Sequence, residues 1–109
     1  MVKQLYSLYV IQLKKTVLKH KKIHTANPDR IIDYPCVYVG STAHTPEYRF
    51  EQHKNGYKAN TFVKKYGYQL IPDLYEEYNP ITTRKKAEIL EEELALKLRE
   101  EGYTVWYGV

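Results

Sequence analysis

The chain has 109 residues, of which 43% are hydrophobic, and its net charge is +4. This length supports one hydrophobic core and excludes two independent ones. The single cysteine excludes an intramolecular disulfide, and no signal-peptide pattern or apolar stretch of membrane-spanning length is present. We therefore expect a cytoplasmic protein that does not associate with membranes.

The charges are divided unevenly along the chain. Residues 1–66 contain twelve Lys or Arg and four Asp or Glu, whereas residues 67–109 contain five and nine. A basic half of this kind favours a surface that meets a polyanion, most commonly nucleic acid. A merely solvated basic surface explains the charge equally well, so charge alone does not decide between them.

The first part of the chain predicts two strands separated by a long basic segment. Residues 5–13 (LYSLYVIQL) are aromatic, apolar and β-branched, and residues 36–40 form a short apolar run that glycine ends. Both patterns are typical of strands, and their closeness favours an antiparallel pair. Between them, residues 14–35 contain five lysines and two turn signals, Asn27-Pro28 and Tyr34-Pro35. We expect a long basic loop there, with room for a short strand or helical turn.

A short helix is predicted over residues 46–54 because both of its ends carry a suitable signal. Thr45 can cap the helix, and Pro46 fits the first helical position, where no N–H donor is needed. Asn55-Gly56 then offers a left-handed stop. Residues 46–54 are therefore predicted to form a short helix.

Four further elements complete the chain. A helix is predicted over 59–66, with Asn60 or Thr61 as its cap and Gly67 as its stop, and a strand over 70–78, which Pro72 places at a sheet edge. A long helix over 82–101, ended by Gly102, and a last strand over 103–109 follow. The resulting order, β-β-α-α-β-α-β, is that of a single α+β domain with an antiparallel sheet.

Helical periodicity separates one glutamate from a run of acidic residues. At 100° per residue, Glu91 lies within the apolar stripe of the long helix, and its acidic neighbours point elsewhere; the stripe consists of Ala87, Leu90, Leu94 and Leu98. A lone carboxylate there is penalised by desolvation unless it is paired, hydrogen-bonded or bound to a cation such as Mg²⁺. The alternative is a stripe edge where Glu91 reaches water or a nearby Lys or Arg.

Arg49 and His53 are four residues apart on the predicted short helix and share one of its faces. Arginine can clamp a phosphate by two parallel hydrogen bonds and stabilise charge that develops on its oxygens. Histidine can position a phosphate or a water, or move protons near neutral pH. Lys54 and Lys58 add positive charge nearby. An ordinary solvated helix surface is the alternative for the Arg/His pair.

Tyr9 and Tyr38 stand out among twelve tyrosines because they lie on the two strands predicted to pair. Their hydroxyls can therefore converge on one patch. A phenol with a pKa of about 10 is a poor base at neutral pH, but adjacent cations or metal-bound water favour the phenolate. The residues themselves leave open which tyrosine would act.

In this order and spacing, the tyrosine segments resemble the motifs of the GIY-YIG nuclease family. Ser7-Leu8-Tyr9 stands in the place of GIY, Tyr38-Val39-Gly40 matches YIG, and Ser41-Thr42 follows as it often does in that family. Arg49 and His53 resemble the helix-borne arginine and its companion histidine. Residues 87–91 are similar to the segment that carries the family's metal-binding glutamate, here Glu91. The resemblance extends over nearly the whole chain.

The resemblance implies a small α+β domain with a central three-stranded antiparallel sheet flanked by helices. It also implies divalent-metal-dependent hydrolysis of DNA phosphodiester bonds to 5′-phosphate and 3′-hydroxyl ends. In that reaction a tyrosine activates water, with Tyr9 slightly preferred over Tyr38, Arg49 stabilises the pentavalent phosphate, and Glu91 holds Mg²⁺ or Mn²⁺. His53 completes the catalytic set. The expected substrate-binding residues are Gly40, Ser41, Thr42, Lys54 and Lys58.

Three departures from the family pattern matter. Ser7 replaces the first glycine of GIY by another small residue. The 28 residues between Tyr9 and Tyr38 far exceed the family's usual short turn, so residues 14–35 resemble a basic insertion. Its lysines could contact DNA phosphates, or the segment could be a variable loop. An asparagine that several members carry after the long helix is replaced by Gly102-Tyr103-Thr104, which puts one supporting contact in doubt.

Two other functions compete with catalysis. The first is a non-catalytic nucleic-acid-binding module, whose basic residues follow the backbone while exposed tyrosines stack on bases. The second is an interaction protein that keeps the fold without chemistry. The combined presence of the tyrosines, Arg49, His53 and Glu91 favours a nuclease. Because the chain is small, we expect selectivity to need branched or otherwise structured DNA, a homodimer or a partner protein.

Overall fold

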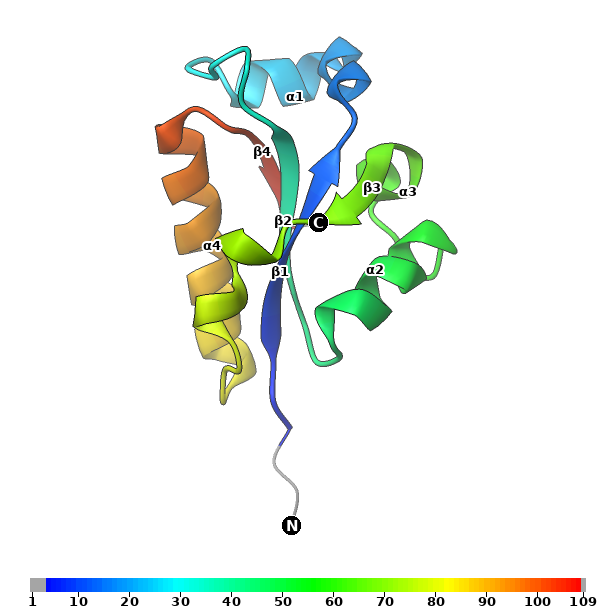
Figure 1. Cartoon of the computed structure of the whole chain (residues 1–109), viewed down its shortest axis with the longest axis vertical. Helices are drawn as coiled ribbons and strands as arrows, with labels where there is room; N and C mark the ends of the chain where they lie inside the picture. The colour runs from blue at the N-terminus through cyan, green and yellow to red at the C-terminus, as the bar shows by residue number, and fades with distance from the viewer. Residues whose placement is uncertain (1–3, 109) are drawn as a thin grey trace.

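A mixed four-stranded sheet forms the centre of the computed structural model, which describes residues 4–108 (Figure 1). Its strands lie in the order β3-β1-β2-β4, where β1 is Ser7–Leu13, β2 is Cys36–Thr42, β3 is Gly67–Leu70 and β4 is Thr104–Tyr107. The described helices are α1 (Lys21–Ala26), α2 (Pro46–Lys54), α3 (Thr61–Tyr66) and α4 (Arg84–Glu101), with 3₁₀ turns η1 (Lys15–Lys19), η2 (Pro72–Leu74) and η3 (Glu76–Tyr78). The predicted α+β class is confirmed. Within residues 4–108, no helix has the length and apolar character needed to cross a membrane.

Helices cover both faces of the sheet. In Figure 1, α4 runs along one face, α2 and α3 lie on the other, and α1 lies at the end where β4 begins. The register places Tyr9 opposite Gly40 and Ile11 opposite Tyr38. Residues directly opposite each other in an antiparallel pair share a face. Both tyrosines therefore point toward α2, while the alternate residues of β1 and β2 form the core beneath α4.

The sheet differs from the predicted antiparallel arrangement by one strand. β3, β1 and β2 are antiparallel neighbours, but β4 adds a fourth strand that runs parallel to β2. The turn at Gly102 is the reason. Its φ of 113° ends α4 in the left-handed conformation, and the Thr104 N–H then donates to the Pro35 carbonyl at 3.2 Å. The last strand thus enters the sheet from the end where β2 also begins.

The strand predicted over residues 70–78 is wrong. The third strand is β3, over residues 67–70, and the chain after Pro72 forms η2 and η3 instead. Proline fixes its own φ near the helical value, so Pro72 begins a 3₁₀ turn. Gly67 does end α3, but with φ −68° and ψ 137° it is extended, and the chain passes directly from helix into strand.

The predicted caps fall close to the observed helix ends. Thr45 accepts a hydrogen bond from the Tyr48 N–H at 3.1 Å, and α2 covers the predicted residues. Gly56 supplies the left-handed stop with a φ of 87°. Asn60 is the cap of α3, because its side chain accepts from two N–H groups of the first turn. Thr83 caps α4, which begins two residues later than predicted.

The basic segment 14–35 is folded onto the sheet through one buried asparagine. Asn27 is 0% exposed. Its amide nitrogen donates to the carbonyls of Ile23 (2.8 Å) and Val105 (3.1 Å). Its oxygen accepts from the Val105 N–H (2.8 Å) and from Arg99 Nε (3.0 Å). The Asn27 amide therefore pairs with both main-chain groups of Val105 as a strand would, and it covers the free edge of β4.

We expect Asn27→Ala to lower the free energy of unfolding by about 3 kcal/mol, because it leaves the buried main-chain groups of Val105 without partners. The matched control is Asn55→Ala, which changes an exposed asparagine at the end of α2 and should cost less than about 0.5 kcal/mol. Urea denaturation followed by Trp106 fluorescence measures both. Equal stability of the two variants would contradict an anchoring role for Asn27.

Candidate active site

The Tyr9 side chain packs against the backbone of β2 at Gly40. A β-carbon at position 40 would overlap both the Tyr9 hydroxyl and the ring carbon that bears it. Tyr9 is 2% exposed, and its hydroxyl lies 2.9 Å from Nε2 of His53 on α2. The glycine at position 40 thus makes room for a phenol that joins β1, β2 and α2.

The backbone of Asn60 determines which nitrogen of His53 carries the proton. The Asn60 N–H donates to His53 Nδ1 at 3.2 Å, so Nδ1 is an acceptor and Nε2 is protonated in the neutral ring. Burial and the nearby Arg49 charge lower the pKa of His53 from 6.5 to about 4. At neutral pH, His53 is therefore neutral and donates its Nε2–H to the Tyr9 oxygen.

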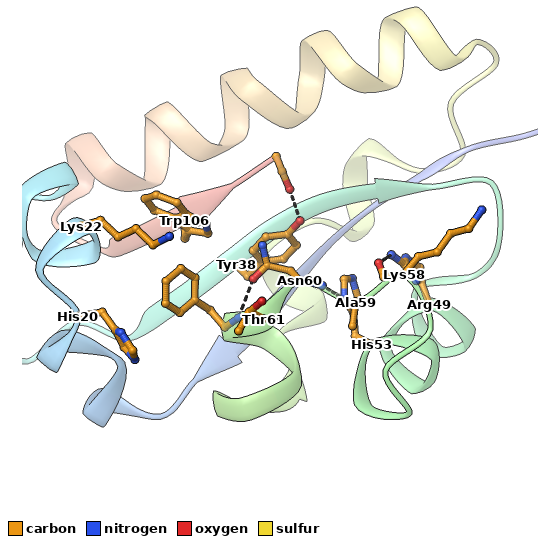
Figure 2. Close-up of a pocket in the computed structure, with 12 residues that line it drawn as sticks. His20, Lys22, Tyr38, Arg49, His53, Lys58, Ala59, Asn60, Thr61 and Trp106 are labelled. Carbon is orange, nitrogen blue, oxygen red and sulfur yellow. Dashed lines mark hydrogen bonds between the residues drawn. The ribbon is translucent and has the colours of Figure 1, made fainter.

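Tyr38 lies beside this pair. Its ring centroid is 6.2 Å from that of Tyr9 and 5.7 Å from that of His53, and its hydroxyl donates to the Gly108 carbonyl (Figure 2). Burial raises the pKa of Tyr9 to about 12, although the Arg49 charge lowers it. Burial raises the pKa of Tyr38 further above 10. Both phenols are therefore protonated at neutral pH.

Arg49 is held by the loop that follows α2. Its guanidinium donates to the carbonyls of Tyr57 (3.1 Å) and Lys58 (2.9 Å) and to the Gln52 side chain (3.2 Å). Lys58 has a φ of 44°, a left-handed conformation that is uncommon for residues other than glycine. The positive charge of Arg49 lowers the pKa of Tyr9 and that of Tyr38, against the larger increase that burial causes. Arg49 therefore brings a positive charge close to the two phenols, and Lys58 adds another in the same cavity wall.

Glu91 is half-buried on α4, as helical periodicity predicts, while Glu88, Glu92 and Glu93 are exposed. The Ser41 hydroxyl donates to its carboxylate at 2.7 Å. Burial raises the pKa of Glu91, and hydrogen bonds from Ser41 and the Gly108 backbone partly offset this increase. A carboxylate in this setting favours an added positive charge.

The donor set around Glu91 fits a metal that is shared with a substrate. Within residues 4–108, no three His, Cys, Asp or Glu side chains are grouped so that they could hold a metal ion. A cation bound at Glu91 would therefore have at most two such side chains as ligands and would complete its shell with water and phosphate oxygens. Mg²⁺ accepts such a shell, because it keeps several waters and needs few protein ligands.

A cavity of about 580 Å³ collects most of the predicted catalytic residues. Tyr38, Arg49 and His53 line it (Figure 2). Tyr9 does not line the cavity, but its hydroxyl is bonded to His53. Glu91 lines a neighbouring hollow of about 380 Å³, and Gly108 borders both. The structure therefore brings four of the five residues together and places the fifth beyond Gly108.

The predicted substrate-binding residues have diverse surroundings. Lys58 lines the cavity, and Ser41 is bonded to Glu91. Gly40 lies beneath Tyr9, and the Thr42 hydroxyl accepts from the His44 N–H at 3.0 Å. The Lys54 ammonium donates to the carbonyls of Lys64 (2.9 Å) and Gly67 (2.7 Å) and so ties α2 to α3 and β3.

Several residues of the site escaped the sequence analysis. Asn60 was expected only as a helix cap, yet its N–H also fixes the His53 ring. Gly108 contacts Tyr38 through its carbonyl, which no side-chain pattern can reveal. The remaining wall of the cavity includes His20, Lys22, Phe62 and Trp106. The basic composition of residues 14–35 pointed to Lys22 and His20 as possible contacts for nucleic acid. It did not show that they lie in the cavity wall.

No protein-family model, curated protein or solved structure matches this chain. Its functional assignment therefore rests on the residues and their geometry.

We predict that His53 makes the protein less stable as the pH falls. The folded pKa of about 4 lies below the unfolded value of 6.5, so the unfolded state binds more protons between these values and the free energy of unfolding decreases toward low pH. From pH 7 to pH 4.5 this contribution is about 2–3 kcal/mol. Urea denaturation across that range measures it.

His53→Gln removes the titrating group and should flatten the pH dependence by that amount. His44→Gln makes the same chemical change at an exposed histidine and should leave the slope as in the parent. An unchanged slope in the His53→Gln protein would show that burial of this ring does not control the pH response.

Proposed function

We propose that this protein is a divalent-metal-dependent endonuclease of the GIY-YIG type. The observation that carries the proposal is the cluster of Tyr9, Tyr38, His53 and Arg49 from three elements, in which Tyr38, His53 and Arg49 line one cavity and the Tyr9 hydroxyl is bonded to His53. The three antiparallel strands β3, β1 and β2, with helices on both faces, support the fold part of the proposal. The parallel strand β4 is an addition to that core.

In this proposal Tyr9 is the general base. Its oxygen receives the His53 Nε2–H and lies near the Arg49 charge, and both favour the phenolate. In the substrate complex the Tyr9 hydroxyl first loses its own proton to solvent, and the resulting phenolate then accepts the water proton as the water oxygen attacks phosphorus. Arg49 stabilises the charge on the phosphoryl oxygens. The P–O3′ bond breaks, the O3′ atom takes a proton from solvent water, and the products carry 5′-phosphate and 3′-hydroxyl ends.

Glu91 is the residue proposed to hold Mg²⁺ or Mn²⁺. When bound, the ion supplies positive charge that stabilises the departing 3′ oxygen. Ser41 orients the Glu91 carboxylate by its 2.7 Å hydrogen bond. Through its hydroxyl, Tyr38 holds Gly108 between the two hollows. In the proposed complex this O–H leaves the Gly108 carbonyl and donates to a phosphate oxygen instead.

The proposed substrate is DNA, cut with low sequence specificity. A domain of this size has little surface for reading bases, so the proposal includes a structured target, a homodimer or a partner protein as the source of selectivity. The competing function is a non-catalytic nucleic-acid-binding module. The cluster of Lys22, Phe62 and Trp106 in the cavity wall favours it, whereas the half-buried Glu91 has no use in a binder.

The first test is cleavage of supercoiled plasmid with Mg²⁺ or Mn²⁺. We expect the parent to nick or cut it, and EDTA to abolish this. Arg49→Ala and Glu91→Gln should each lower the rate by at least about 100-fold, because they remove charge that acts in the transition state. Glu93→Gln, on an exposed face of the same helix, should retain parent activity.

Equal cleavage by the parent and the Glu91→Gln protein would indicate a contaminating nuclease and contradict the assignment. Binding of DNA without cleavage under each metal would favour the binding module instead.

A second test separates the two tyrosines. Tyr9→Phe should reduce the single-turnover cleavage rate by about 10²–10⁴-fold, the range for losing a general base. Tyr38→Phe should cost about tenfold, because it removes one hydrogen-bond donor. Tyr68→Phe changes an exposed tyrosine and serves as the control. A larger loss in Tyr38→Phe than in Tyr9→Phe would reverse the assignment of the base.

A further inference from the structure

The cavity that holds the catalytic residues has a second end that the proposed reaction does not use. Arg49, His53 and Lys58 lie at one end in Figure 2, and Lys22 and Trp106 lie at the other, with Tyr38 between them. The second end is built from α1 in the basic segment, from α3 and from β4. The side chains at this second end therefore indicate what it can bind.

Aromatic rings and a cation are grouped at this second end. Phe62 and Trp106 meet edge to face with centroids 5.6 Å apart. The Lys22 ammonium lies 5.2 Å from the Phe62 centroid and 5.9 Å from the Trp106 centroid. Lys22 is exposed and Trp106 is only partly buried, so a ligand can reach both. Rings with an adjacent cation are the features that bind bases and phosphates of single-stranded nucleic acid.

The size of the cavity limits what can enter. A volume of about 580 Å³ suits a small ligand, whereas a duplex is a broad convex body. In a duplex each base face is covered by its neighbours, so only an unpaired base offers a free face for stacking. A base that enters can take the place of the Lys22 ammonium on the rings, and the ammonium is then free to pair with a phosphate.

We infer that this end of the cavity is a subsite for one unpaired DNA nucleotide. The base stacks on the ring of Trp106 with its edge toward the buried Phe62, whose ring lies at 81° to that of Trp106, and Lys22 binds a phosphate of the same strand. Asn60 and Thr61 lie along the cavity between the two ends and can hydrogen-bond to the base edge (Figure 2). The strand then continues toward Arg49, where the scissile phosphate lies.

This inference rests on the proposed function for the position of the scissile phosphate, and it names the substrate class. The preferred substrate is DNA with an unpaired nucleotide beside the cleaved bond, such as a flap or a single strand. A continuous duplex cannot place a base on Trp106 without first losing a pair.

Trp106 is the only tryptophan of the chain, so its fluorescence reports binding at this end directly. The full chain is titrated in EDTA, where it does not cleave, with an oligothymidine strand and with a blunt duplex of equal length. We expect saturable quenching by the strand and at least about tenfold weaker binding of the duplex. Equal affinity for the two probes would overturn the inference.

Variants at the second end test whether Lys22 and Trp106 contact the bound strand or only stabilise the fold. Lys22→Gln should weaken strand binding at least about fivefold, and Trp106→Leu, followed by anisotropy of a labelled strand, at least about tenfold. Lys21→Gln, at the exposed neighbouring position of α1, should bind as the parent does, and Lys22→Arg should restore affinity. Equal binding by the Lys22→Gln and Lys21→Gln proteins would refute the subsite.

Cleavage separates the two proposals. With Mg²⁺ or Mn²⁺, the parent should cut a flapped duplex at least about tenfold faster than a fully paired one, and Trp106→Leu should lose this preference. Cleavage of both substrates at equal rates would overturn the subsite and leave the nuclease. Tight strand binding without cleavage of any substrate would overturn the nuclease and leave the subsite as that of a binding module.

Discussion

The arrangement of the candidate site depends on the contact between Tyr9 and Gly40. Because position 40 has no β-carbon, the Tyr9 ring can pack against β2 and carry its hydroxyl to His53 on α2. The His53 ring is fixed in turn by the N–H of Asn60, the residue that caps α3. The close contact between Tyr9 and Gly40 therefore helps to set the positions of α2 and α3 on the sheet. The same residues form the core and the candidate catalytic set, so a change that loosens the packing also displaces the chemistry.

Burial creates the electrostatic state of this site. It raises the pKa of both phenols and lowers that of His53, so in the free chain these three side chains are neutral beside the positive charge of Arg49. Arg49 is also already bonded to loop carbonyls. The free chain therefore lacks a ready base, and additional positive charge near Tyr9 is needed to produce one. This requirement agrees with a reaction that begins only when substrate and cation are both in place.

Local signals in the sequence predicted much of this structure, and long-range contacts account for what they missed. Thr45, Gly56 and Gly102 act within a few residues, so the ends of α2 and α4 could be read directly. Periodicity identified Glu91 because one helix turn is enough to define its face. By contrast, the parallel direction of β4 and the pairing of Asn27 with Val105 join residues far apart in the chain. No propensity or spacing encodes such contacts.

The position of the basic segment follows from the strands that it joins. β1 and β2 are antiparallel neighbours, which a turn of about two residues can connect, so residues 14–35 are not needed to form the sheet. Asn27 fastens the segment to β4, and the His20 ring bonds to the Tyr66 hydroxyl of α3 at 2.8 Å. These two anchors make the segment close one end of the sheet between α3 and β4. With a short turn instead, the His20 and Lys22 part of the cavity wall beside Phe62 and Trp106 would be absent. The segment thus supplies the wall that extends the candidate site into a cavity with two ends.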